Sequence, residues 1–97
     1  MANVEILSEH QGQQGWTFDA QVLESDGTLR RHQVTLSWAD YNLWSPDGRD
    51  VPARVVQAML DFVLDRLDAD DLPAKLDASL ARRRFADADA TIPKLIE

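Results

Sequence analysis

The chain has 97 residues, of which 44% are hydrophobic and 28% are charged, and its formal net charge at pH 7 is -7. This length is that of one domain, residues 1–97, with one modest core. The chain has no cysteine, which excludes a disulfide framework and a thiolate metal site. The acidity disfavours binding to nucleic acid and to anionic lipid, so we expect the partner to be a protein.

The first ten residues and the hydropathy pattern indicate where in the cell the protein is expected. The first ten residues, MANVEILSEH, lack the basic start and the apolar run of a signal peptide. No apolar run reaches the roughly 20 residues that are needed to span a bilayer. We therefore expect a cytoplasmic protein that does not contact the membrane.

The first part of the chain alternates apolar and polar side chains, which is typical of half-buried strands. We predict strands at residues 3–8, 16–24 and 28–37. A two-residue turn between the last two would set each apolar side chain opposite a polar one. A three-residue loop of Ser25, Asp26 and Gly27 instead sets Phe18 opposite Val34, and we predict that loop.

Helical patterns follow the strands. Ser37 fits the N-cap of a short helix at residues 38–44. Residues 51–67 carry apolar side chains at helical spacing over more than one face, so this helix should contact both a sheet and another helix. A last helix is predicted at about residues 72–85. Residues 87–97 are expected to form a frayed tail, and docking of Ile92, Leu95 and Ile96 is the alternative.

The predicted fold class is therefore α+β with two layers. An antiparallel three-stranded meander comes first, and a short helix and two longer helices follow and pack on one face of the sheet. We find no linker or repeat that would divide the chain into two domains.

Two short motifs are similar to segments of known proteins. They are Val34-Thr35-Leu36-Ser37 with Tyr41, and Asp77-Ala78-Ser79-Leu80 with Arg83 and Phe85. On these residues the chain resembles a group of short, uncharacterised bacterial proteins. The resemblance implies a bacterial protein with strands first and helices after, and it brings no activity with it.

No residue pattern indicates catalysis. His10 lies in a predicted loop and His32 on the apolar side of a strand, and no serine stands in a nucleophile elbow. The aspartates at residues 65–71 lack the spacing of a calcium loop, so we expect them to be solvated or to cap the next helix. We predict that the protein is not an enzyme and has no catalytic residue, metal or cofactor.

Two groups of side chains are candidates for protein contacts. Trp44 stands beside a polar turn, where an exposed tryptophan could anchor an interface, and use in the core is the equal alternative. Arg82, Arg83 and Arg84 form the one basic cluster. We expect them to neutralise the acidic residues 68–71, within one molecule or between subunits, and phosphate binding is the alternative.

A third candidate group, Arg31, Gln33 and Thr35, shares one face of the third predicted strand. A solvated sheet face is the simplest interpretation. The order of strand, short helix and longer helix also resembles ribbon-helix-helix repressors, in which strands of two subunits pair and read bases in the major groove. We predict a non-enzymatic protein-interaction or regulatory module that binds a partner protein or itself as a homodimer; the alternative is a ribbon-helix-helix-like DNA-binding regulator.

Overall fold

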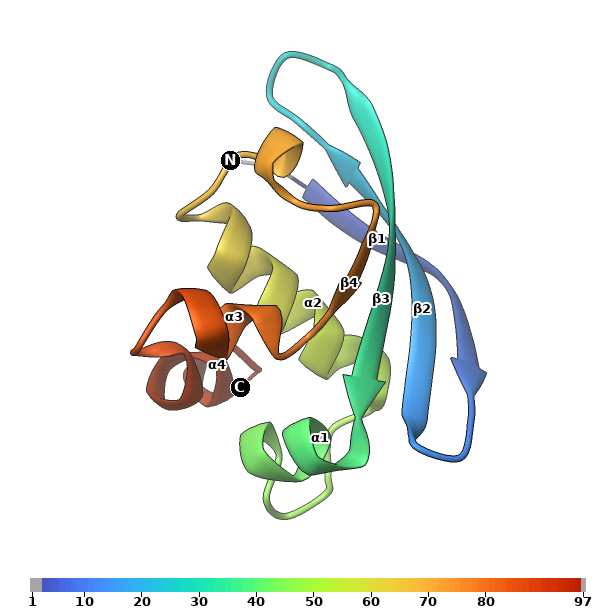
Figure 1. The fold of residues 1–97 in the computed structure, drawn as a ribbon, viewed down its shortest axis with the longest axis vertical. Helices are drawn as coiled ribbons and strands as arrows, with labels where there is room; N and C mark the ends of the chain where they lie inside the picture. The colour runs from blue at the N-terminus through green and yellow to red at the C-terminus, as the bar shows by residue number, and fades with distance from the viewer. Residues whose placement is uncertain (1–2, 97) are drawn as a thin grey trace.

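The computed structural model describes residues 3–96 as a four-stranded sheet with helices on one of its faces (Figure 1). The strands are β1 (Asn3–Gln11), β2 (Gly15–Leu23), β3 (Leu29–Ser37) and β4 (Lys75–Asp77). The helices are α1 (Trp38–Trp44), α2 (Pro52–Leu64), α3 (Leu80–Arg84) and α4 (Ala88–Ile96), with a 3-10 turn, η1, at Ala69–Asp71. The α+β class and the β1–β2–β3 meander are confirmed, and the sheet has a fourth strand that we did not predict.

The hairpin between β2 and β3 has the predicted register. Phe18 lies opposite Val34. The backbone N–H of Glu24 donates to the carbonyl oxygen of Thr28 at 2.9 Å, which closes a loop of three residues. Gly27 takes a φ of 91°, a conformation that glycine adopts without steric cost. The short helix is also confirmed, because α1 covers the predicted residues.

The pairing of β1 with β2 has two local features. The register shifts between Ile6 and Ser8, so Leu7 has no partner of its own, which is a β-bulge. Gly15 starts β2 with a φ of 148°, and a Cβ at this position would collide with the backbone carbonyl of Leu36. The turn from β1 therefore approaches β3 more closely than any side chain would allow.

The chain returns to the sheet at β4, which runs parallel to β3. The N–H of Gln33 donates to the carbonyl of Ala74, and the N–H of Ala78 donates to the carbonyl of Thr35, both at 2.7 Å. The predicted helix at residues 72–85 is therefore wrong over its first half. Leucines four residues apart fit a helical face, but an even spacing also keeps them on one side of an extended segment.

The helical layer is built around α2, which buries seven side chains: Val55, Val56, Ala58, Met59, Leu60, Phe62 and Val63. This helix is shorter than the predicted residues 51–67. α4 packs against it through Ala88, Ile92 and Ile96, which recur every four residues and so share one helix face. The expected frayed tail is therefore wrong for residues 88–96, and the alternative of docking is confirmed for Ile92 and Ile96 but not for Leu95, which is 39% exposed. Residue 97 lies outside the described residues.

Candidate functional site

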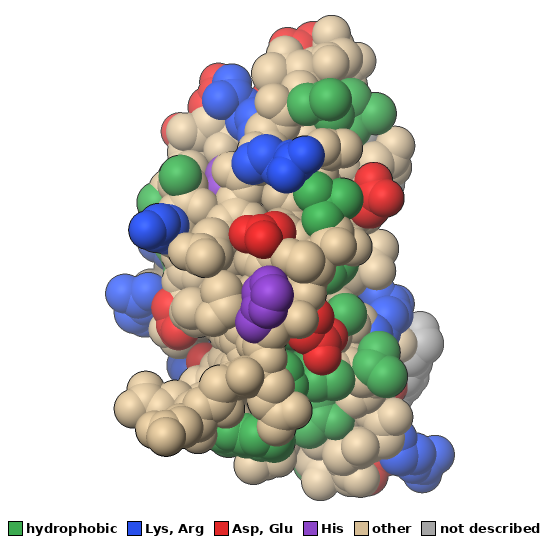
Figure 2. Space-filling view, turned by 90° about the vertical axis from the view of Figure 1, so that its right-hand side faces the viewer, with side chains coloured by type: hydrophobic (Ala, Val, Ile, Leu, Met, Phe, Trp, Pro, Cys, Tyr) green, Lys and Arg blue, Asp and Glu red, His purple; other side chains and the backbone are tan. Residues whose placement is uncertain are grey.

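The helices cover one face of the sheet and leave the other face uncovered (Figure 1). Alternate residues of each strand point to this uncovered face. Two rows of side chains cross it by register, and they are Ser8, Asp19, Gln33 and Lys75, and His10, Thr17, Thr35 and Asp77. Figure 2 shows this face, with charges of both signs over its middle and hydrophobic side chains towards its two ends.

Hydrogen bonds between strands order part of this surface. They join Ser8 to Asp19 (2.8 Å), Arg31 to Gln21 (3.1 Å) and Thr35 to Asp77 (2.7 Å). Within residues 3–96, the side chains of Gln33 and Lys75 form no such bond. The uncovered face therefore offers unused donors and acceptors beside side chains that are already held in place.

The carboxylate of Asp77 is the most constrained group on the uncovered face. It accepts hydrogen bonds from the Thr35 hydroxyl and from the backbone N–H of Ser79, at 2.7 and 3.0 Å. Partial burial acts to raise the pKa of Asp77. The hydrogen bonds from Ser79 and Thr35, with the charge of Arg83, outweigh it, so the pKa lies below its ordinary value of 3.8.

Two exposed leucines lie on this face at the end where the β2–β3 hairpin turns. Leu23 and Leu29 lie directly opposite each other on β2 and β3, and they are 39% and 59% exposed. Arg31 is the next residue of β3 on the same face. Exposed leucines beside an arginine and polar side chains are a composition that suits contact with another protein.

The structure places the three strand candidates as predicted and contradicts one use of them. Arg31, Gln33 and Thr35 are exposed on one face of β3. However, β3 is an inner strand that pairs with β2 on one edge and β4 on the other. The pairing of two subunits through this strand, which a ribbon-helix-helix arrangement requires, is therefore blocked from Gln33 to Thr35, because β2 occupies one edge there and β4 the other.

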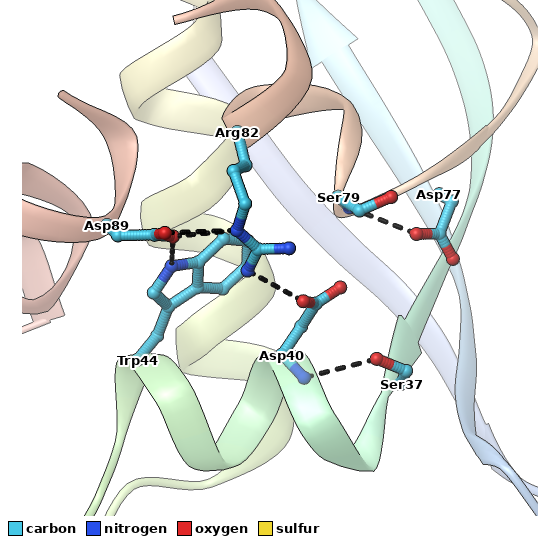
Figure 3. Close-up of polar contacts among 7 residues, drawn as sticks. All are labelled: Ser37, Asp40, Trp44, Asp77, Ser79, Arg82 and Asp89. Carbon is cyan, nitrogen blue, oxygen red and sulfur yellow. Dashed lines mark hydrogen bonds and ion pairs between the residues drawn. The ribbon is translucent and has the colours of Figure 1, made fainter. Parts of the chain in front are cut away.

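The prediction that Trp44 is an exposed anchor is also wrong. Its side chain is 1% exposed, and its indole N–H donates to the Asp89 carboxylate at 2.9 Å (Figure 3). The guanidinium carbon of Arg82 lies 5.5 Å from the centroid of the indole ring. The exposed tryptophan is instead Trp38, which is 41% exposed and packs on Trp16 with 4.2 Å between ring centroids.

The basic cluster divides between two roles. Arg82 pairs with the buried Asp40 at 2.7 Å and with Asp89 at 3.0 Å, so it joins α1, α3 and α4 (Figure 3). Arg83 and Arg84 are exposed in the last turn of α3, where positive charge favours the helix dipole.

The expectation that these arginines neutralise residues 68–71 within one molecule is therefore wrong for Arg82, and the same contact between subunits stays a prediction. Arg30, on β3, is the arginine that pairs with Asp70 there. The sequence carries no signal for the pairs Arg82–Asp40 and Arg30–Asp70, because each of them joins residues that are far apart in the chain.

The two histidines are not placed for shared chemistry. His10 is exposed on the uncovered face, whereas His32 points to the opposite face and is buried. Nδ1 of His32 lies 2.9 Å from the carbonyl oxygen of Pro73, and its Nε2 is buried without a hydrogen-bond partner. Over residues 3–96, no three His, Cys, Asp or Glu side chains come close enough to hold a metal ion.

None of the helices described between residues 3 and 96 has the length and apolarity that a membrane crossing demands. Comparisons with protein-family models, with curated proteins and with solved structures found no match to this chain. The uncovered face of the sheet is the candidate site that the geometry favours, because Trp44 and Arg82 join the helices to one another.

Proposed function

We propose that this protein is a non-enzymatic protein-interaction module that binds its partner through the uncovered face of the sheet. One observation carries the proposal. The exposed Leu23–Leu29 pair lies beside Arg31 and Gln33 on a face that no element of residues 3–96 covers. Burial of such leucines and use of such polar groups would both favour association.

The partner that we test first is a second copy of the chain. The face of a sheet can pack on its own copy about a twofold axis. Both subunits then use the same surface patch for the contact. The mixed charges on the face allow an acidic side chain of one copy to meet Arg31 or Lys75 of the other.

The test combines solution mass with crosslinking. Light scattering on a sizing column would give the mass of the wild type and of Leu29→Ser. A photo-crosslinking amino acid at Gln33 would then report in cells whether a protein covers the face. We expect one discrete crosslinked species from position 33, which is lost when Leu29→Ser is added.

A matched control uses Leu43, an exposed leucine of α1 outside the sheet. Leu43→Ser should leave both the mass and the crosslink unchanged. A monomer with no crosslink at position 33 contradicts the proposal, and so does a crosslink that survives Leu29→Ser. A crosslink to a different protein, sensitive to Leu29→Ser, supports the module and replaces the homodimer as its form.

A further inference from the structure

A second surface lies on the helical side of the sheet, apart from the uncovered face. It is a hollow of about 810 Å³ lined by the start of β1, by one side of α2 and by α4. Val4, Phe62 and Leu95 supply apolar lining, and Asp61, Asp65 and Arg66 supply charge. Such a mixture of apolar wall and few charged groups is typical of sites that hold a side chain of defined chemistry.

The hollow adjoins a free strand edge. β1 is the outermost strand, and in the described part of the chain it pairs only with β2. Before the bulge at Leu7, the residues from Asn3 to Ile6 keep a regular register. An extended peptide can add to such an edge through main-chain hydrogen bonds, with alternate side chains directed to the pockets beside it.

The two aspartates that line the hollow lack partners within residues 3–96. Asp61 lies in the last turn of α2 and Asp65 follows its last residue as the C-cap, one helical turn further on, so their carboxylates share a side of the helix end. The nearby arginines are engaged elsewhere. Arg54 donates to the carbonyl oxygen of Leu95 at 2.6 Å, and Arg66 donates to Asp87 at 3.0 Å.

The wall of the hollow partly desolvates the carboxylate of Asp61, which remains accessible to a ligand. Burial raises its pKa above the ordinary 3.8, and the charge of Arg54 only partly opposes this. A cation brought into the hollow would offset the partial loss of hydration of this carboxylate. Two carboxylates without a third ligand suit an ammonium or guanidinium group better than a metal ion.

From this juxtaposition we propose that the hollow and the free edge of β1 bind an extended peptide segment that carries arginine or lysine. The peptide main chain adds to β1 before the bulge, and its cationic side chain reaches Asp61 and Asp65. The net charge of -7 also draws such a segment to the protein.

The test is a titration of the whole chain with an acetylated and amidated peptide, Arg-Val-Arg-Val-Arg-Val, followed by backbone amide NMR. We expect shifts at Val4 and Asp61, and an affinity about tenfold weaker in Asp61→Asn. Asp65→Asn should give a similar loss. The melting temperature of Asp61→Asn at pH 7 should not fall below that of the wild type, so that a loss of binding cannot be explained by a loss of fold.

Two controls separate this site from general attraction between opposite charges. Asp47→Asn makes the same change of charge on an exposed loop and should leave the affinity unchanged. The same peptide with every backbone amide methylated has no N–H left on either edge, so it cannot add as a strand and should not bind.

Equal weakening by Asp47→Asn and Asp61→Asn would overturn the proposal, as would shifts that avoid β1. Full binding by the methylated peptide would overturn the strand-addition mode. Leu29→Ser should leave peptide binding intact, so failure of this site and failure of the uncovered face are distinguishable.

Discussion

Residues 3–64 and residues 65–96 reach their folds by different means. The first region has long strands and the long helix α2, and each strand pairs with the next along the chain. The second has short elements that are held by side chains of distant residues, as in the pairs Thr35–Asp77, Asp40–Arg82 and Trp44–Asp89. Local pattern is enough to specify the first, whereas the second needs the first as a template.

The largest expected effect on stability tests whether the fold of residues 3–64 depends on the close approach of the β1–β2 turn to β3. Gly15→Ala places a Cβ against the backbone of Leu36, where neither atom can move freely. We expect a loss of about 3 kcal/mol or more in the free energy of unfolding, from the clash and from the positive φ. Denaturant unfolding measures it.

Gly12→Ala is the matched control in the same turn. Its Cβ would meet only ordinary contact, 3.8 Å from the carbonyl oxygen of Gly15, so the cost should be below about 1 kcal/mol. If both glycines tolerate alanine equally, the close approach of the turn to β3 is not a requirement of the first region.

The second effect tests the side-chain clamp of the later region. Arg82→Ala leaves the buried Asp40 carboxylate without its cation. We expect a loss of about 2–3 kcal/mol, less than for a fully buried pair because the Arg82 side chain is 35% exposed. Hydrogen exchange should show faster exchange in α3 and α4 than in β2 and β3, where protection should remain.

Arg83→Ala removes the same charge from the exposed neighbouring position and should cost about 0.5 kcal/mol or less. Uniform loss of protection across β2, β3 and α4 in Arg82→Ala would contradict the division into two regions.

The smallest expected effect on stability tests the contact between the two regions, where β3 pairs with β4. Thr35→Val keeps the shape of the side chain and removes the hydrogen bond to Asp77, which should cost about 1 kcal/mol. Thr17→Val, in the same row of the uncovered face, is the control and should be near neutral.

The pH dependence of that effect has a definite sign. The pKa of Asp77 in the folded state lies below 3.8, so the ionised carboxylate stabilises the fold above that pH. This stabilisation is lost as the pH falls through the folded-state pKa. The stability difference between wild type and Asp77→Asn should therefore be constant near neutral pH and shrink below pH 3.8; a difference that grows on acidification would reverse the assignment.

The sequence was sufficient for the fold wherever a signal is local. The loop of residues 25–27 follows from the period of two in the flanking strands, and Ser37 accepts the N–H of Asp40 as its position before α1 predicted. β4 could not be found in this way. It has three residues, and Leu76 is a strand residue only because Val34 lies beside it.

The same limit applies to the candidate site. Alternation placed Arg31, Gln33 and Thr35 on one exposed face, because strand side chains alternate whatever the tertiary context. The sequence leaves Trp44 open between the core and an exposed anchor, and the structure confirms the core, because the burial of Trp44 depends on Asp89 and α4, a segment whose sequence resembles a polar tail. The exposure of Trp38 likewise depends on how α1 packs. No residue near Trp38 or Trp44 in the sequence indicates which of the two is buried.

The parallel pairing of β3 with β4 also has a consequence for synthesis. During translation β3 emerges early, but the strand that covers its outer edge is made only after α1, α2 and η1. A nascent chain therefore carries an open strand edge for much of its synthesis, which is a site for pairing between chains on neighbouring ribosomes.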